Sequence, residues 1–246
     1  MTSFLRCIHS GFYKLRHTSM VWIHIFIPLV IAALFSVYYC VSPWKVDAKM
    51  SGYFEAVGIG FPIIIGLVCG KAAEQENEAG CFQNMMCCIK SRATAYAGKL
   101  TVLLLLSAFA VALAAGVFSA GFKAAPFSVY MNAGALLFTG SLFIYILHLF
   151  ISVKFGRGAS IGLGIFESLI SALSITGLGD GVWYYIPCTW SVRLCDSFIY
   201  GWFYHAEAVG YAEICKCFTI LVPSVIGAFA LSLLWFRRFE GRKTSG

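Results

Sequence analysis

Charged residues are scarce in this chain. Aspartate, glutamate, lysine and arginine make up 12% of its 246 residues, whereas hydrophobic residues make up 60%. A soluble domain carries about 25% charged residues, so an ordinary soluble fold is excluded. The charge-poor stretches recur at about the length of a helix that crosses a bilayer, about 20 residues. The composition therefore predicts a membrane protein.

The sequence also lacks the motifs of common nucleotide and metal sites. It has no Gly-x-x-x-x-Gly-Lys-Ser/Thr pattern, and in the nearest match, Gly66 to Lys71, the glycines stand one residue too close. Its ten cysteines include no Cys-x-x-Cys pair, the spacing typical of zinc and thioredoxin-like sites. We therefore expect no metal and no cofactor in this chain. If ATP is used, a separate protein must hydrolyse it.

The scattered cysteines leave one question open. Cys69 and Cys217 fall in apolar segments, where a thiol behaves as a small hydrophobic group. Cys188, Cys195 and Cys215 share one predicted loop. One disulfide among these three would form only if that loop faces an oxidising space.

Six apolar segments are long enough to cross a bilayer. We place them at about residues 20–39, 53–70, 100–121, 130–153, 160–175 and 217–236. The first is too long for the apolar region of a signal peptide and lacks a small-residue cleavage site, so we expect it to remain in the protein. These segments predict an all-α integral membrane protein that forms a single transmembrane domain over residues 1–246.

The basic residues predict how this domain is oriented. Six spans place both termini on one side, and that side carries 13 of the 18 lysines and arginines. Basic residues concentrate on the cytoplasmic side of membrane proteins. The termini and the 71–99 loop are therefore predicted to be cytoplasmic, and the 176–216 loop extracellular. This orientation explains the net charge of +7 without a nucleic-acid partner.

Residues 1–19 are predicted to form a helix in the membrane interface. Its apolar residues recur at spacings of mostly three to four, with basic residues between them: Phe4, Leu5, Ile8, Phe12 and Leu15. Such a helix places its apolar side in the acyl boundary and its cations near anionic lipid headgroups. The alternative is a simple cytoplasmic extension of the first span.

The most distinctive polar segment lies in the predicted 71–99 loop. On a helix, Glu74, Glu78 and Phe82 would share one side at four-residue spacing. This would place an acidic stripe and an aromatic side chain at the cytoplasmic surface. A short helix of this kind can bind in a groove of a soluble partner and transmit its movement. A solvated charged loop is equally consistent with the sequence.

A Gly-x-Ser-x-Gly pattern at residues 158–162 requires a hydrolase to be considered. An intramembrane hydrolase would need Ser160 and His148 to approach each other from two spans. No strand precedes the serine, as it does in soluble hydrolases. Gly158 and Gly162 also form a small-xxx-small pair, which lets two helices pack closely. We favour this packing interpretation.

Two carboxylates lie inside the predicted spans, those of Glu55 and Glu167. An unpaired charge in hydrocarbon is costly, so each needs an explanation. They could line a polar path or contact a cationic substrate. Alternatively, Glu55 reaches water at the outer interface, and Glu167 is protonated or bonded to a serine such as Ser171.

Several short motifs spread over the whole chain are shared with a known family. They are Trp22-Ile-His-Ile, Pro28, Tyr38-Tyr39, Ser42-Pro-Trp-Lys45, Tyr53-Phe-Glu55, Glu74-Gln-Glu76, Ala79-Gly80, Phe82-Gln-Asn84, Lys99-Leu100 and Trp235-Phe-Arg-Arg-Phe-Glu-Gly-Arg-Lys243. Through them the chain resembles the permeases of lantibiotic self-immunity ABC transporters, the MutE/EpiE/MutG group of ABC-2-type subunits. The segment from Glu74 to Asn84 and the tail are the most specific parts.

This resemblance implies a transporter subunit and not an enzyme. Two permeases, either two copies or one copy and a companion, would work with two copies of an ABC ATPase that holds ATP and Mg. The complex would expel a lantibiotic, an antimicrobial peptide, from the bacterial plasma membrane and so give self-immunity. The residues that would contact the ATPase are Glu74, Glu76, Glu78, Phe82, Gln83 and Asn84.

The resemblance does not identify the residues that contact the peptide. Lantibiotics are amphipathic and act at the outer face, among membrane lipids, so we expect this contact in the 176–216 loop. The candidate residues are Glu55, Glu167, Trp183, Tyr184, Tyr185, Trp190 and Trp202. Aromatic residues also gather at membrane interfaces for structural reasons. The alternatives are an ABC-2-type exporter of another lipid, drug or peptide, a peptide sensor, and the intramembrane hydrolase.

Overall fold

A computed structural model describes residues 3–16, 18–83, 85 and 91–241. Within these ranges the chain forms helices joined by turns, and no strand is present. The α-helices are α1 (Ser3–Arg16), α2 (Ser19–Val41), α3 (Val46–Glu78), α5 (Arg92–Gly121), α6 (Phe127–Phe155), α7 (Arg157–Ile175), α8 (Trp190–Phe203) and α9 (Glu207–Arg237). Two short 3₁₀ helices, η1 (Trp183–Tyr185) and η2 (Pro187–Thr189), precede α8.

Six of these helices are long and apolar enough to cross a membrane: α2, α3, α5, α6, α7 and α9. The prediction of an all-α protein with six membrane-spanning helices is therefore confirmed. Several helices are longer than the predicted spans. The largest difference is in α3, which continues to Glu78 where the second span was predicted to end at residue 70.

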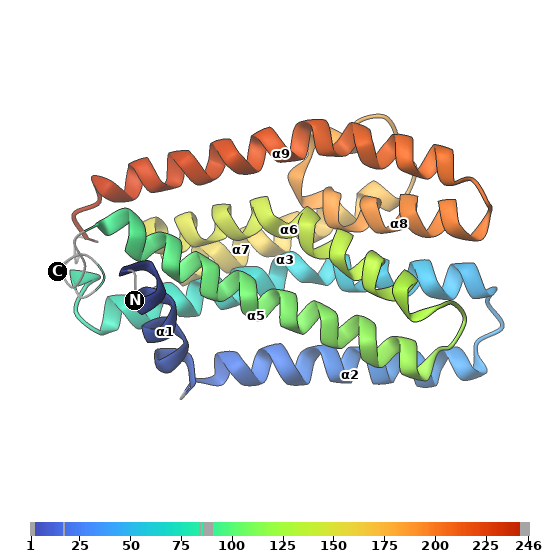
Figure 1. Ribbon diagram of the computed structural model, residues 1–246, viewed down its shortest axis with the longest axis horizontal. Helices are drawn as coiled ribbons and strands as arrows, with labels where there is room; N and C mark the ends of the chain where they lie inside the picture. The colour runs from blue at the N-terminus through green and yellow to red at the C-terminus, as the bar shows by residue number, and fades with distance from the viewer. Residues whose placement is uncertain (1–2, 17, 84, 86–90, 242–246) are drawn as a thin grey trace.

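Both ends of the chain lie at the same end of the helix bundle (Figure 1). We call this the termini end and the opposite one the far end. Helix α1 crosses the termini end at a steep angle to the bundle axis and packs against α5. A helix lying along the membrane surface would have this orientation relative to the spans.

The segment predicted as a loop at residues 176–216 is largely helical. Helix α8 lies at the far end and packs against α6, α9 and α3 (Figure 1). The first turns of α9 also belong to this segment, since α9 begins at Glu207. The far end therefore presents a packed helical surface.

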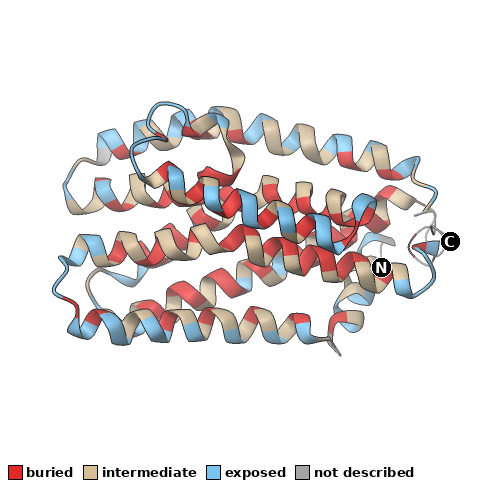
Figure 2. Ribbon diagram, turned by 180° about the vertical axis from the view of Figure 1, so that it is seen from behind, coloured by how far each residue is buried: buried red, intermediate tan, exposed pale blue. Residues whose placement is uncertain are grey.

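Buried side chains concentrate on the inner helices, whereas α2 and α9 are the most exposed spans (Figure 2). The exposed side of α2 carries large apolar residues about one turn apart: Trp22, Phe26, Val30, Leu34 and Val37. Exposure of this apolar stripe is unfavourable in water and favourable against lipid acyl chains. The outer face of α2 is therefore suited to contact lipid.

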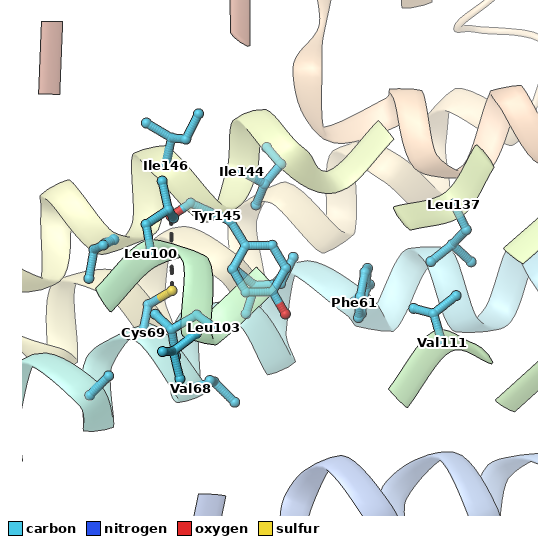
Figure 3. Close-up of a cluster of buried hydrophobic side chains, with 14 of the residues drawn as sticks. Phe61, Val68, Cys69, Leu100, Leu103, Val111, Leu137, Ile144, Tyr145 and Ile146 are labelled. Carbon is cyan, nitrogen blue, oxygen red and sulfur yellow. Dashed lines mark hydrogen bonds between the residues drawn. The ribbon is translucent and has the colours of Figure 1, made fainter. Parts of the chain in front are cut away.

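The buried core is shared by α3, α5 and α6 (Figure 3). Phe61 and Cys69 come from α3, Leu103 from α5 and Tyr145 from α6, and the Cys69 thiol lies 4.0 Å from the Tyr145 carbonyl oxygen. Cys217 is also fully buried. The two thiols thus occupy apolar surroundings, as predicted.

Glycines allow α3 and α7 to approach closely. A Cβ atom on Gly66 would lie 2.6 Å from the Ser160 carbonyl oxygen, and one on Gly164 would lie 2.5 Å from the Pro62 carbonyl oxygen. By contrast, a Cβ atom on Gly158 or Gly162 would meet nothing within 4 Å. The expectation that Gly158 and Gly162 pack two helices of this chain together is therefore wrong, because that side of α7 faces outward.

Candidate functional site

The last turns of α3 carry a buried ion cluster at the termini end. Glu76 is 3% exposed. Its Oε1 atom lies 2.8 Å from the Lys99 Nζ atom, and its Oε2 atom lies 2.9 Å from the Lys14 Nζ atom. Lys99 belongs to α5 and Lys14 to α1. A single carboxylate therefore joins three helices.

Gln75 strengthens the same junction, since its side-chain amide donates to the Lys14 carbonyl oxygen at 3.3 Å. Breaking a buried ion pair by removing one partner costs about 3–5 kcal/mol, because the other charge is left uncompensated. The helices α1, α3 and α5 are therefore held together at this point. The Glu76 carboxylate therefore pairs with groups inside the protein and is not presented at the surface.

Glu74 makes a more exposed connection. Its Oε2 atom lies 3.0 Å from an Arg157 guanidinium nitrogen, and both side chains are more than 40% exposed. Exposed pairs of this kind contribute about 0–1 kcal/mol. Arg157 is the first residue of α7, so this pair links the end of α3 to the start of α7. Glu78 is exposed at the last position of α3.

The chain turns back immediately after α3. Gly80 has a φ of 126°, a backbone conformation that favours glycine. This turn buries Phe82, which is 0% exposed and lies 5.6 Å from the Phe239 ring, centroid to centroid. The expectation of one helix that presents Phe82 at the surface is therefore wrong. Gln83 is exposed, and Asn84 lies outside the described residues.

A second polar group lies inside the membrane domain. The His148 Nδ1 atom is 2.8 Å from the Ser160 hydroxyl, and its Nε2 atom is 2.7 Å from a Glu167 carboxylate oxygen. These three residues have the serine, histidine and carboxylate order of a hydrolase triad. All three are buried. The approach of Ser160 and His148, which the hydrolase alternative required, is therefore present.

The hydrogen bonds of this triad do not suit catalysis. The Ser160 hydroxyl donates to the Gly66 carbonyl oxygen at 3.1 Å. This carbonyl oxygen competes with the His148 Nδ1 atom for the single serine proton, which a general base must accept. Ser160 and His148 are both 0% exposed, so a substrate does not reach them. The group instead ties α3, α6 and α7 together.

The partner of Glu167 differs from the one expected. The Ser171 hydroxyl donates to the backbone carbonyl oxygens of Glu167 and Cys188, at 2.9 Å and 2.7 Å, and not to the Glu167 carboxylate. His148 pairs with that carboxylate instead. In the sequence, His148 and Glu167 are polar residues within apolar spans. Their pairing requires α6 and α7 to run side by side, which periodicity alone does not show.

A third polar group lies at the far end, where Glu55 of α3 approaches Asp196 of α8. Burial, together with the neighbouring Glu55 carboxylate, raises the pKa of Asp196 well above its usual range. The Asp196 Oδ1 atom is buried and has no hydrogen-bond partner among the described residues. Sequence reasoning missed Asp196, because the segment that contains it was interpreted as a loop.

Asp196 lines a hollow between α8, η1 and the start of α9. Its lining residues are Asp180, Trp183, Arg193, Asp196, Ser197, Tyr200, Val209, Gly210 and Glu213. Arg193 forms an ion pair with Asp180, and its guanidinium lies 5.7 Å from the Trp183 ring centroid. Glu213 accepts a hydrogen bond from Tyr184 and pairs with Lys216 at 2.9 Å. The hollow thus combines carboxylates with aromatic rings.

The predicted aromatic contact residues fall into two groups. Trp183 and Trp190 are 2% and 1% exposed, and the Trp190 indole N–H donates to the Tyr184 carbonyl oxygen at 2.8 Å. These two tryptophans stabilise the far end. Tyr184 and Trp202 are partly exposed, and Tyr185 is mostly exposed. Only this second group presents substantial aromatic surface to a ligand.

The three cysteines of this segment are free thiols: Cys188 and Cys195 are buried, and Cys215 is exposed. Burial raises the pKa of the Cys188 thiol to about 11, which keeps it protonated and unreactive at neutral pH. Across the part of the chain that the structure describes, no cluster of three histidine, cysteine or acidic side chains is arranged to hold a metal ion.

Comparison with known families and proteins gives one match. Residues 7–172 match the family described as ABC-2 family transporter protein, and no curated protein matches the chain. The matched range contains the Glu76 cluster and the triad around His148. Members of this family are membrane subunits of ABC transporters and work with a separate ABC ATPase. Since the match covers more than half of the chain and six helices can cross a membrane, this chain is a multi-pass membrane protein that belongs to the ABC-2 transporter family.

Proposed function

We propose that this chain is the permease subunit of an ABC transporter that expels a lantibiotic from the bacterial plasma membrane and so protects the producing cell. It pairs with a second copy or a companion permease. A separate ATPase binds at the termini end, which faces the cytoplasm. The proposal combines membership of the family with the motif resemblance and the two polar surfaces at the ends of the bundle.

The observation that carries the proposal is the cluster around Glu76. An ATPase that binds the exposed end of α3 would displace a helix that is fixed to α1 and α5 through Lys14 and Lys99. The Glu74–Arg157 pair extends this connection to α7. Movement at the end of α3 would therefore reach four helices. Packed helices of this kind respond by small rigid shifts, which suits alternating access.

The proposed coupling residues differ in their exposure. Glu74, Glu78 and Gln83 are accessible and form the proposed ATPase contact, together with Asn84. Glu76 and Phe82 are buried and hold this segment in place. The ATPase contact is therefore a small acidic and polar surface, and its partner surface should carry complementary basic groups.

The far end supports the choice of an amphipathic peptide as cargo. Its hollow has carboxylates on Asp180 and Glu213, which pair with Arg193 and Lys216, and the exposed ring of Tyr200. A cationic group of a peptide could replace Arg193 or Lys216 as the partner of these carboxylates, and the aromatic ring could contact its apolar side chains. We therefore place the peptide contact in this hollow, with Tyr184, Tyr185 and Trp202 at nearby surfaces. Glu55 lies behind Asp196 on the same path.

Bacterial survival tests this proposal. A sensitive bacterium would express the chain with a candidate ATPase, with a hydrolysis-deficient ATPase, or alone, and would be exposed to a panel of lantibiotics. We expect protection only when the chain and an active ATPase are both present. Protection with the inactive ATPase would instead indicate a sensor or a binding protein. Absence of protection despite verified membrane assembly would indicate an exporter of another cargo.

Two matched variants make the same experiment specific for the coupling surface. Glu78→Lys reverses a charge on the exposed end of α3, whereas Glu240→Lys makes the same change on an exposed residue of the tail. We expect Glu78→Lys to abolish protection at unchanged membrane levels and Glu240→Lys to retain it. Equal protection by both variants would remove α3 from the ATPase contact.

A further inference from the structure

An apolar pocket between α2, α3, α5 and α6 has no role in the proposed transport cycle. Its wall includes Ile23, Ile27 and Ile31 of α2, Gly60 and Phe61 of α3, Val111 of α5 and Tyr145 of α6. Figure 3 shows Phe61, Val111 and Tyr145, which belong to the inner wall. The lining on α2 covers about two helical turns, or about 12 Å. This length is comparable with that of a ten-carbon chain.

One polar side chain, His24, lines this pocket and lacks a partner on one side. His24 is 4% exposed. Its Nδ1 atom lies 2.7 Å from the Met20 carbonyl oxygen. Because a carbonyl oxygen only accepts hydrogen bonds, Nδ1 carries a proton. In the neutral ring the Nε2 atom is then an acceptor, and it is buried with no partner among the described residues.

A buried acceptor without a partner is unfavourable, since its desolvation is not compensated. A ligand that donates a hydrogen bond to Nε2 would remove this penalty. The remaining lining is almost entirely apolar, so a charged donor would be poorly solvated there. The suitable ligand has one uncharged donor, such as a hydroxyl group, on an aliphatic body.

The pocket is open beside Gly60. A Cβ atom on Gly60 would meet nothing within 4 Å. Helix α2 packs mainly against α5 and makes much less contact with α3, so the pocket lies at a loosely packed contact. Because α2 exposes its other side to lipid, an amphiphile can enter from the membrane without crossing water.

We propose that this pocket is a binding site for a hydroxyl-bearing aliphatic lipid, whose hydroxyl group donates to the His24 Nε2 atom and whose chain lies along α2. The site is distinct from the far-end hollow and from the ATPase surface. It does not depend on which cargo the transporter moves. Its occupant would bridge α2 and α3, the pair of neighbouring spans with little contact of their own.

Photolabelling of the full chain in phosphatidylethanolamine and phosphatidylglycerol nanodiscs tests the proposal. The probe is a 1-decanol derivative with a diazirine in its chain, and the labelled peptides are identified by mass spectrometry. We expect labelling within residues 23–31 and 56–64, which form the pocket wall. Unlabelled 1-decanol should compete at a concentration about tenfold lower than decyl methyl ether, which has no hydrogen-bond donor.

Two variants, each with a matched control, test separately the hydrogen bond to His24 and the free space of the pocket. His24→Phe retains an aromatic ring but removes the acceptor, so the alcohol and the ether should compete equally. His9→Phe makes the same change on an exposed residue of α1 and should preserve the tenfold preference. Gly60→Leu should fill the pocket and abolish specific labelling. Gly116→Leu, at another glycine whose Cβ would meet nothing within 4 Å, should leave labelling unchanged.

Either of two results would overturn the proposal. Equal competition by the alcohol and the ether in the unmodified chain would show that His24 accepts no hydrogen bond from the ligand. Labelling that is unchanged by Gly60→Leu, or spread evenly along the lipid-facing helices, would show contact with bulk lipid only. Both readouts are independent of ATP hydrolysis and of protection against a peptide.

Discussion

The Asp196 carboxyl group makes the stability of the far end depend on pH. Its pKa is raised by burial and by Glu55, whereas an aspartate in an unfolded chain has a pKa of about 3.9. The folded protein therefore binds this proton more tightly than the unfolded chain does. The stabilising contribution is complete below about pH 4 and is lost as the pH rises through the raised pKa.

We predict that Asp196→Asn reduces this pH dependence and raises the melting temperature at neutral pH. The amide has a similar shape and no proton to lose. The measurement is thermal unfolding of the purified protein in detergent from about pH 4 to about pH 8. Asp180→Asn, at an exposed residue paired with Arg193, is the control and should keep the original profile. Identical profiles for Asp196→Asn and the unmodified protein would contradict the assignment.

The buried group of His148, Ser160 and Glu167 is predicted to serve stability and not catalysis. His148→Ala leaves the Glu167 carboxylate without its partner and should cost about 3–5 kcal/mol. Ser160→Ala leaves the buried His148 Nδ1 atom without its partner and should cost about 1–3 kcal/mol. Denaturant or thermal unfolding in detergent measures both. Protection against the peptide should survive Ser160→Ala, and its loss in a well-folded variant would revive the hydrolase interpretation.

The polar side chains of the spans could be predicted only in part from the sequence. A carboxylate in an apolar span is visible in the sequence, so Glu55 and Glu167 could be selected as candidates. Their partners could not be selected. His148 lies on another span from Glu167, and Asp196 lies on a helix that the composition did not reveal. Which polar groups meet depends on the rotation of each helix about its axis, and packing sets that rotation.

Close packing of α3 against α7 provides a test at matched glycines. In the structure, a side chain at residue 164 would collide with the Pro62 carbonyl oxygen, whereas one at residue 162 would enter open space. We predict that Gly164→Val destabilises the protein by about 1–3 kcal/mol through overpacking. Gly162→Val should be close to neutral. Thermal unfolding in one detergent compares them, and equal destabilisation would contradict this helix pairing.

The six spans were predictable because each contains a long apolar stretch that only a helix can carry through a bilayer. The true end of α3 was not, since its last turns are polar and are stabilised by Lys14 and Lys99. The helix α8 was missed for a similar reason. Its sequence is mixed in polarity, and its burial depends on α6 and α9, which pack on it. Tertiary contacts thus stabilise the end of α3 and the helix α8, which hydropathy did not predict.

The basic residues predict that the termini end of the protein faces the cytoplasm. Glu78 lies at the termini end and Lys123 at the far end, and both are exposed. In a background whose native cysteines are replaced by serine, we predict that a membrane-impermeant maleimide applied to intact spheroplasts labels Lys123→Cys and does not label Glu78→Cys. Cell disruption should make Glu78→Cys reactive. Labelling of Glu78→Cys in intact cells would reverse the topology and contradict cytoplasmic binding of an ATPase.

The function proposed for this ABC-2 family protein is the removal of a lantibiotic from the membrane. The most direct test measures how much labelled peptide remains bound to cells that express the chain with its ATPase. We predict that the amount of cell-bound peptide falls and that the peptide appears intact in the medium. A hydrolysis-deficient ATPase should abolish this release. Survival with undiminished membrane-bound peptide, or release that does not require ATP hydrolysis, would contradict transport by this chain.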